Sequence, residues 1–331
     1  MPAVQNFPGD GLILVTGGAG FIGSNVVLEL TNAGGRVVVC DLFRSGEKWR
    51  NVAAALLYDI VHPNDLPEWL ARHGDKVAAV VHMAAISSTT EKDVDKFVAT
   101  NIRLTLDLWG WCAANAVRLI YASSAATYGD GSAGFSDEQS PAALAALHPL
   151  NAYGWSKHVV DRRVVDDVTR GRATPRQWAG LKFFNVYGPN ETHKGFMQSL
   201  VSKISPTVKA GQTVTLFKSH DPSYPDGGQL RDFIYVKDCV AVVSWLLAHP
   251  ETSGLFNVGT GTARTFLDLV HAVCAAVGCA PDIRFIDTPD ELRAQYQYFT
   301  CADVTKLRRA GFDASFYSLD DGVRDYLGQL S

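Results

Sequence analysis

The 331-residue sequence predicts an α/β fold, a doubly wound parallel sheet with helices on both faces, on three observations. First, a β-branched apolar run over residues 12–16 ends at three glycines spaced three apart, Gly17, Gly20 and Gly23, and an apolar helical pattern follows at once. Second, short apolar runs alternate with amphipathic stretches from residue 12 to about residue 185. Third, the length exceeds one typical domain and suits a nucleotide-binding part with a smaller second lobe.

The glycine turn predicts a dinucleotide site. Glycine is needed because the turn demands unusual backbone angles, because a side chain would hold a pyrophosphate away from the backbone N–H groups, and because helix and strand must pack closely. A glycine-rich turn alone can be a plain loop. Here a second apolar run, residues 36–40, ends in Asp41, at the spacing where a carboxylate meets the adenosine ribose. We therefore expect residues 11–185 to form a Rossmann-type dinucleotide-binding domain.

Two cations, Arg44 and Lys48, follow Asp41 in a polar turn. They can belong to a solvated loop, or they can pair with a 2′-phosphate and favour NADP over NAD. Asp41 can accept a hydrogen bond from a ribose 2′-hydroxyl, but it repels a 2′-phosphate unless the cations offset its charge. We expect tightly bound NADP, with NAD as the alternative.

Two further apolar runs extend the nucleotide-binding part. Residues 57–60 predict a third strand whose end borders the adenine. Residues 77–85 predict a fourth strand that runs into small residues, where the backbone can approach a dinucleotide. His82 lies on this apolar strand, where a core histidine with satisfied hydrogen bonds is more frequent than a ligand.

The fifth apolar run, residues 119–129, ends in hydroxyl residues that include Ser124. The carboxyl ends of parallel strands form the ligand crevice, so these hydroxyls are expected to face the cofactor. A longer loop, residues 130–149, comes next. Its apolar segment, residues 141–147, is expected to cover the site.

Tyr153 and Lys157 are four residues apart and share one face of a predicted helix. On an ordinary helix this spacing gives a neutral surface pair. The chemistry that needs it is proton transfer, because a nearby ammonium, helped by the positive nicotinamide ring, stabilises tyrosinate and brings a phenol pKa of about 10 towards neutrality. Such a tyrosine can take a proton from a carbinol while the cofactor takes the hydride.

Beyond a sixth apolar run, residues 181–189, the regular alternation ends. Residues 186–331 are expected to form mainly a substrate-binding lobe, interleaved with the first domain because part of 230–260 returns to it. Residues 229–238 are strand-like, and Asp238 is expected to cap a helix that begins directly after it.

The composition argues against several classes of partner. Hydrophobic residues make up 47% of the chain and the formal charge is −4, so nothing indicates disorder, nucleic-acid binding or a basic membrane-binding face. No apolar run approaches a membrane span and residues 1–10 lack a signal-peptide core, so we expect a cytoplasmic protein with a small-molecule substrate. The six cysteines show no paired C-x-x-C spacing and are expected to be buried thiols, with no metal site.

The string T-G-G-A-G-F-I-G, the strand-end Ser-Ser and the Y-x-x-x-K spacing together resemble the extended short-chain dehydrogenase/reductases over almost the whole chain. More narrowly, residues 86–91, 122–129, 184–195 and 231–233 resemble the family of ADP-L-glycero-D-manno-heptose 6-epimerases. The S-S-T-T-E and H-K-G elements discriminate this family, because nucleotide-sugar epimerases at large share the rest.

The resemblance implies the roles of the site residues. Ser124, Tyr153 and Lys157 would form a catalytic triad, and Lys194, which taken alone would be a solvated loop lysine, would be a second acid/base on the other side of the sugar. The implied cofactor-binding residues are Gly17, Gly20, Phe21, Ile22, Gly23, Asp41, Leu42, Lys48, Asp59, Ile60, Met83, Ala84, Ala85, Asn101, Tyr153 and Lys157. The implied substrate-binding residues are Ser87, Ser88, Thr89, Ser124, Asn185, His193, Lys194, Phe217, Arg231 and Tyr296.

The reaction implied by the resemblance is NAD(P)-dependent epimerisation at C6 of an ADP-heptose, by transient oxidation to a ketone and re-reduction, in the synthesis of the lipopolysaccharide inner core. The protein would be a homo-oligomer, a pentamer by the same resemblance. One alternative is another nucleotide-sugar epimerase or a dehydratase, although Ala125 and Ala126 stand where a dehydratase carries an acidic pair. The other is a non-catalytic dinucleotide-binding scaffold, which would typically lose Tyr153 or Lys157.

Overall fold

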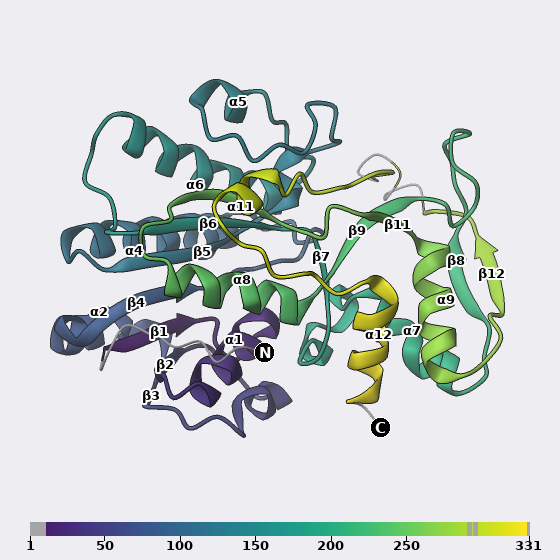
Figure 1. The fold of residues 1–331 in the computed structure, drawn as a ribbon, viewed down its shortest axis with the longest axis horizontal. Helices are drawn as coiled ribbons and strands as arrows, with labels where there is room; N and C mark the ends of the chain where they lie inside the picture. The colour runs from purple at the N-terminus through teal and green to yellow at the C-terminus, as the bar shows by residue number, and fades with distance from the viewer. Residues whose placement is uncertain (1–10, 290–292, 294–296, 330–331) are drawn as a thin grey trace.

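The structure is a computed structural model that describes residues 11–289, 293 and 297–329. A seven-stranded parallel sheet lies at its centre, with helices on both faces and a smaller lobe at one end (Figure 1). The predicted doubly wound parallel fold is therefore confirmed. In spatial order the strands are β10 (Gly254–Val258), β6 (Trp178–Phe183), β5 (Arg118–Ser124), β4 (Val77–His82), β1 (Leu12–Thr16), β2 (Arg36–Cys40) and β3 (Asp59–Val61).

The strands are continuous apolar runs because both faces of the sheet are covered. In β1, Leu12 and Leu14 pack into one core, whereas Ile13 and Val15 pack into the other. The helices over the first face are α2 (Leu66–His73), α4 (Leu104–Ala114) and α6 (Ala152–Thr169). The helices over the second face are α1 (Phe21–Asn32), α8 (Val236–Ala248) and α11 (Thr305–Arg309).

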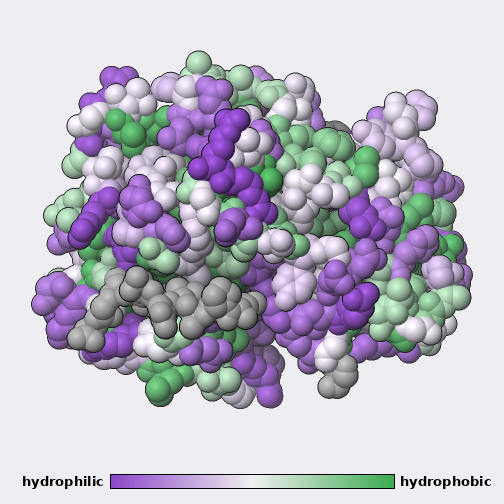
Figure 2. Space-filling model, viewed as in Figure 1, coloured by the Kyte–Doolittle hydropathy of each residue, from purple (hydrophilic) through white to green (hydrophobic). Residues whose placement is uncertain are grey.

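The smaller lobe has its own apolar core. It contains two small sheets, β11 (Ala263–Thr265) with β9 (Leu230–Tyr235) and β7 (Asn185–Tyr187), and β12 (Ile283–Ile286) with β8 (Val214–Phe217). Its longer helices are α7 (Leu200–Lys209), α9 (Phe266–Val277) and α12 (Leu319–Gly328). Between β9 and β11 the chain returns to the main sheet through α8 and β10. Figure 2 shows hydrophilic residues over much of the visible face, including α12.

Short helical segments complete the connections. They are η1 (Glu47–Val52), η2 (Pro63–Asp65), η3 (Gly74–Lys76), α3 (Val94–Phe97), η4 (Val98–Arg103), η5 (Ala125–Tyr128), α5 (Pro141–Ala145) and η6 (Thr192–Met197). Within the described residues, no helix is both long and apolar enough to cross a membrane.

The expected cap at Asp238 is wrong. Helix α8 begins at Val236, so Asp238 lies inside its first turn and not before it. Its buried carboxylate accepts a hydrogen bond from the backbone N–H of Tyr317 (3.1 Å). The helix begins earlier because the apolar residues at its start pack into the cores on both sides.

The loop 130–149 also differs from its expected position. Leu144 and Leu147 are buried in the core that α6 covers, and α5 contacts α6. None of these loop residues lines the cavity described below. The apolar side chains of this segment are therefore buried in the core on that face of the sheet, and the segment does not cover the site.

His82 is a core histidine, as predicted. It is fully buried between the Thr16 hydroxyl (Nδ1, 2.6 Å) and the Thr105 hydroxyl (Nε2, 2.9 Å). Burial lowers its pKa to about 3, so the ring is neutral. All six cysteines are free thiols. The prediction that they are buried is confirmed for Cys40, Cys112, Cys239 and Cys274. Cys301 is half-buried, and the prediction is wrong for Cys279, which follows the end of α9 and is exposed.

The packing of α1 on the glycine turn generates the first prediction. A Cβ on Gly23 would lie 2.1 Å from the carbonyl oxygen of Gly17, whereas a Cβ on Gly110, in α4, would meet nothing within 4 Å. Gly23→Ala should lower the free energy of unfolding by about 1–3 kcal/mol through overpacking. Gly110→Ala is the matched control and should raise it by about 0.5–1 kcal/mol through helix propensity. Urea unfolding followed by circular dichroism measures both, and an unchanged midpoint in Gly23→Ala would contradict the close packing.

Candidate active site

A cavity of ≈1470 Å³ opens at the carboxyl ends of the parallel strands, next to the smaller lobe. The ends of the strands contribute Thr16, Asp41, Met83 and Ser124, and the lobe contributes residues such as Phe266. A pocket for one small ligand typically measures about 300–1,000 Å³, so this cavity has room for a dinucleotide and a second ligand. Doubly wound folds bind their ligands at this edge of the sheet.

The glycine turn forms one wall of the cavity. Gly17 has a φ of +67°, and a Cβ there would lie 2.6 Å from the backbone nitrogen of Ala84, so only glycine fits between β1 and the segment after β4. The turn closes with a hydrogen bond from the Gly20 N–H to the Gly17 carbonyl (3.0 Å). Residues 21–23, the first turn of α1, line the cavity. Because N–H groups in a first helical turn lack intrahelical partners, this cradle fits a pyrophosphate.

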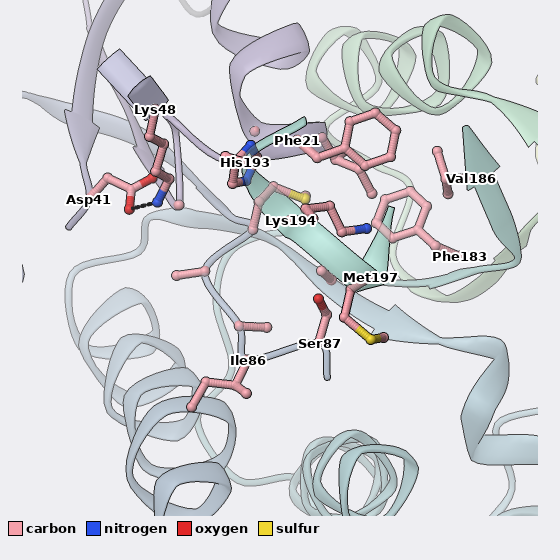
Figure 3. Close-up of a pocket in the computed structure, with 18 of the residues that line it drawn as sticks. Phe21, Asp41, Lys48, Ile86, Ser87, Phe183, Val186, His193, Lys194 and Met197 are labelled. Carbon is pink, nitrogen blue, oxygen red and sulfur yellow. Dashed lines mark hydrogen bonds and ion pairs between the residues drawn. The ribbon is translucent and has the colours of Figure 1, made fainter. Parts of the chain in front are cut away.

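Asp41 ties the end of β2 to the glycine turn. One carboxylate oxygen accepts from the N–H of Ala19 (2.8 Å), and the other accepts from the N–H of Leu42 (2.6 Å) and from the ammonium of Lys48. The dashed line in Figure 3 marks the ion pair with Lys48. Arg44 lines the cavity as well. Both carboxylate oxygens of Asp41 therefore already accept hydrogen bonds, and the ammonium of Lys48 balances the negative charge.

Ser124, Tyr153 and Lys157 come together where β5 meets α6, and all three line the cavity. The side chain of Asn151 accepts from the N–H of Gly154 (2.9 Å), so the helix begins at Ala152 and Tyr153 lies in its first turn. Burial raises the pKa of Tyr153 above its usual value, and a hydrogen bond with Ser124 opposes this effect.

Lys157 lies one helical turn beyond Tyr153 and is buried. Its ammonium donates to the backbone carbonyl of Ala122 (2.8 Å), near the end of β5. Burial lowers the pKa of Lys157 to about 8, and the negative charge of Asp161 opposes this effect. An ammonium fixed on this wall can stabilise a tyrosinate formed on the same helix face.

Lys194 brings a second amine to the cavity from η6. Gly195, with a φ of +54°, breaks the helical geometry directly after it. The ammonium lies 5.1 Å from the centre of the Phe21 ring. Burial lowers the pKa of Lys194, Glu191 opposes this effect and Lys203 adds to it. Figure 3 shows Lys194 beside Phe183 and apart from the ion pair of Asp41 and Lys48.

Most of the predicted site residues line this one cavity. They are Gly17, Gly20, Phe21, Ile22, Gly23, Asp41, Leu42, Lys48, Met83, Ala84, Ala85, Ser87, Ser124, Tyr153, Lys157, Asn185, His193 and Lys194. They come from both parts of the chain, so the expected cofactor and substrate residues border a shared space.

Asp59 and Ile60, expected at the adenine, lie outside the cavity. The strand β3 begins at Asp59, whose carboxylate accepts from the indole N–H of Trp69 (2.7 Å), and Ile60 is 55% exposed. The cavity is instead reached by Pro63 and Asn64, which follow the strand. The predicted strand, residues 57–60, begins two residues before β3, and the residues expected at its carboxyl end lie outside the cavity.

Asn101, expected to bind the cofactor, lies behind the cavity wall. Its buried side chain accepts from the N–H of Ile86 (2.8 Å), and donates to the carbonyl of Ile86 (2.9 Å) and to the hydroxyl of Ser156 (3.0 Å). Ile86 lines the cavity. Asn101 therefore fixes the loop after β4 and joins it to α6 without lining the cavity itself.

Ser88 and Thr89 do not line the cavity, whereas Ser87 does. The hydroxyl of Ser88 accepts from the backbone N–H of Glu91 (3.1 Å) and so closes a local turn.

Phe217 and Arg231 also lie outside the cavity. Phe217 ends β8. The buried guanidinium of Arg231 donates to the carbonyl of Gln297 and lies 5.6 Å from the centre of the Phe266 ring. Tyr296 lies outside the described residues.

Sequence analysis missed several apolar residues of the cavity, among them Phe183, Met197, Phe233 and Phe266. Three of them had a local signal, because Phe183 ends a strand, Met197 follows Lys194 by three residues and Phe233 stands in the R-D-F string. Phe266 had none, since only the packing of α9 brings it to the site.

The comparisons agree with this geometry. Residues 13–259 match the model of the NAD dependent epimerase/dehydratase family. A curated relative from Nitratidesulfovibrio vulgaris (strain DP4) is 48% identical over 322 residues, which cover 96% of this chain and 97% of the relative. One from Fusobacterium nucleatum is 43% identical over 325 residues, which cover 96% and 97%. Both are named ADP-L-glycero-D-manno-heptose-6-epimerase.

Solved structures give the same result. The ADP-L-glycero-D-manno-heptose-6-epimerase of Helicobacter pylori is 27% identical, with a TM-score of 0.81, over 100% of this chain and 99% of that one. The UDP-glucose 4-epimerase of Thermus thermophilus, in complex with NAD, is 26% identical, with a TM-score of 0.74, over 96% and 98%. The family model over residues 13–259 and the curated relatives show that this chain belongs to the NAD dependent epimerase/dehydratase family.

Proposed function

We propose that this chain epimerises C6 of an ADP-linked heptose in the synthesis of the lipopolysaccharide inner core. The observation that carries the proposal is one cavity that combines a glycine cradle, the group Ser124, Tyr153 and Lys157, and a second amine, Lys194, from a different element. The substrate comes from the shared name of curated relatives that are 42–48% identical to this chain.

The chemistry explains why two acid/base groups are needed. C6 carries a hydroxyl and no adjacent carbonyl acidifies it, so direct removal of its hydrogen as a proton is implausible. A bound nicotinamide dinucleotide supplies the hydride acceptor and donor. Tyr153 and Lys194 then take and return the hydroxyl proton, one for each face of the carbon, while Ser124 holds the oxygen. The charge of Lys157 lowers the energy of the tyrosinate, and burial lowers the pKa of Lys194, which increases the fraction present as the neutral amine that can accept a proton.

We propose NADP as the cofactor. The residues that would hold it are the glycine turn, the first turn of α1 and the segments after β2 and β4. The carboxylate of Asp41 already accepts from Ala19, Leu42 and Lys48. Its charge is thus offset, and Arg44 and Lys48 stand at the cavity wall where they could pair with a 2′-phosphate.

The division of labour and the assembly are also proposals. Residues 11–185, with part of 230–260, would bind the cofactor, and residues 186–331 would mainly bind the sugar. Support comes from β10, which pairs with β6 in the main sheet, and from α8, which packs on that sheet. Residues of the smaller lobe also line the cavity. We further propose a cytoplasmic homo-oligomer, a pentamer by family resemblance, which light scattering on the purified protein tests.

Removing either acid/base group should impair epimerisation. Tyr153→Phe and Lys194→Met are each expected to lower kcat for interconversion of the C6 epimers by at least ~10²-fold, the typical loss for a general acid or base. The bound dinucleotide should stay in place in both variants. Chromatography that resolves the two ADP-heptose epimers measures the rate.

Lys203→Met is the matched control, because Lys203 is an exposed lysine near Lys194 that does not line the cavity. It should keep full activity. Full activity in Lys194→Met as well would remove Lys194 from the mechanism.

The cofactor proposal predicts which nucleotide the protein carries. NADP should be released when the purified protein is denatured, and Arg44→Met should shift the ratio of the NADP and NAD dissociation constants towards NAD by about tenfold, the value of one charge-assisted hydrogen bond. Arg72→Met is the control, since Arg72 pairs with Glu68 in α2 and neither residue lines the cavity. Release of NAD alone would show the choice of NADP to be wrong.

Turnover in D₂O separates hydride transfer from every route that removes a proton from C6. A hydride does not exchange with water, so the epimerised heptose should carry no deuterium at C6 by mass spectrometry. A carbanion route would leave its proton on a side chain that trades with solvent. Stoichiometric deuterium at C6 would therefore overturn the redox mechanism.

A further inference from the structure

A buried ion pair lies next to the proposed catalytic residues. Lys182, in β6, and Asp161, in α6, are both fully buried, with 2.8 Å between the ammonium and the carboxylate. The same carboxylate accepts from the hydroxyls of Ser123 (2.7 Å) and Tyr121 (3.0 Å) in β5. The ammonium also donates to the hydroxyl of Thr127 (2.7 Å). One carboxylate thus gathers donors from two strands and anchors α6 to both.

This network is continuous with the contact that holds Lys157. Asp161 is four residues after Lys157, so both side chains leave the same face of α6. Tyr121, Ala122 and Ser123 are consecutive in β5, and the first and third bind Asp161 while the carbonyl of the second binds Lys157. The register of α6 against the strand end is therefore fixed by three neighbouring contacts, directly before Ser124.

A fully buried ion pair is a costly way to stabilise a fold, because well-packed apolar residues often do as well or better. The carboxylate of Asp161 has two buried ammoniums near it: that of Lys182 donates to it, and that of Lys157 donates to the carbonyl of Ala122 and feels its charge. This arrangement calls for a reason beyond stability.

Asp161 is the main charge that acts on Lys157, because the neighbouring ionisable groups are either neutral or lie farther away. The pKa of His82 is lowered to about 3 and that of His158 to about 4, mainly by burial, so both rings are neutral. Burial raises the pKa of Tyr121 and of Tyr128, so both phenols are neutral as well. Titratable and charged groups farther out are Asp137 and Asp303 on the side of Tyr128, Lys306 near Lys182, and Arg162 and His148 on the side of His158.

We propose that Asp161 and Lys182 are positioning residues for Lys157, which fix its ammonium on the end of β5 and set its charge. The inference rests on the role of Lys157 in the proposed function. The negative charge of Asp161 stabilises the charged form of Lys157. The ammonium of Lys182 donates to the same carboxylate and offsets part of that negative charge. The two residues should therefore act on Lys157 in opposite directions.

The test compares Asp161→Asn, Lys182→Met and the double variant, with Asp167→Asn as the control on the same helix. Asp167 pairs with Arg163 and Arg172 and has no contact with the network. The titration of Lys157 is followed by ¹³Cε-lysine NMR, with its signal assigned by Lys157→Arg, and the pH dependence of epimerisation is measured in parallel.

Because Lys157 must be charged for activity, its loss of a proton sets the alkaline limb of the rate profile. In Asp161→Asn, the midpoints of the alkaline limb and of the NMR titration should both move down by about one pH unit, a tenfold change in the ionisation constant. In Lys182→Met, both midpoints should move up by a similar amount. The double variant should fall between them and the control should not move. A merely structural pair would change stability and leave these midpoints where they are.

Asp161→Asn leaves a buried ammonium without its partner and is the variant most prone to unfold. Lys182→Met keeps Asp161 and gives a test that does not depend on that variant, and an unchanged midpoint in Lys182→Met would overturn the proposal. If the unaltered chain does not interconvert the C6 epimers, the proposed function fails, whereas the NMR titration still reports on the pair.

Discussion

The site depends on the close contact between the glycine turn and its neighbours. The Gly17 backbone touches the start of the segment after β4, and α1 approaches the same turn so closely that a Cβ on Gly23 would overlap it. The carboxylate of Asp41 then joins the end of β2 to the N–H of Ala19. Three strand ends are thereby held within reach of one ligand, and the first turn of α1 stays open toward it.

The parallel sheet extends this constraint to the other half of the site. All seven strands run in the same direction, so β5 and β6 end at the same edge as β1. Helix α6 contacts the end of β5, and its residues Tyr153 and Lys157 line the cavity. The buried contacts of Asp161 fix its register. Tyr153, Lys157 and the glycine turn thus line the same cavity because of the topology of the sheet, not because they are close in sequence.

The sequence predicted what depends on local pattern. The apolar runs located the strands, and glycine spacing and the Y-x-x-x-K pair located the groups that line the cavity. The start of β3 at Asp59 was predicted two residues too early, because a strand boundary shifts by a residue or two without changing the apolar pattern. The contacts of Asn101 could not be predicted, because a pattern does not say which way a polar side chain points, and here it binds Ile86. Phe266 was missed because its place depends on how α9 packs in the other lobe.

Burial acts on both lysines of the cavity, but the surroundings give it different consequences. Lys157 is held by a carbonyl on a rigid strand, and a buried carboxylate restores part of its charge. Lys194 sits on a short kinked segment instead. That segment is fixed at its base, where buried Glu191 accepts from the N–H of Gly188 (3.3 Å) and from the hydroxyl of Ser199 (2.6 Å). A lysine on a rigid wall suits a fixed electrostatic role, whereas an amine with a lowered pKa on a loop suits the gain and loss of a proton.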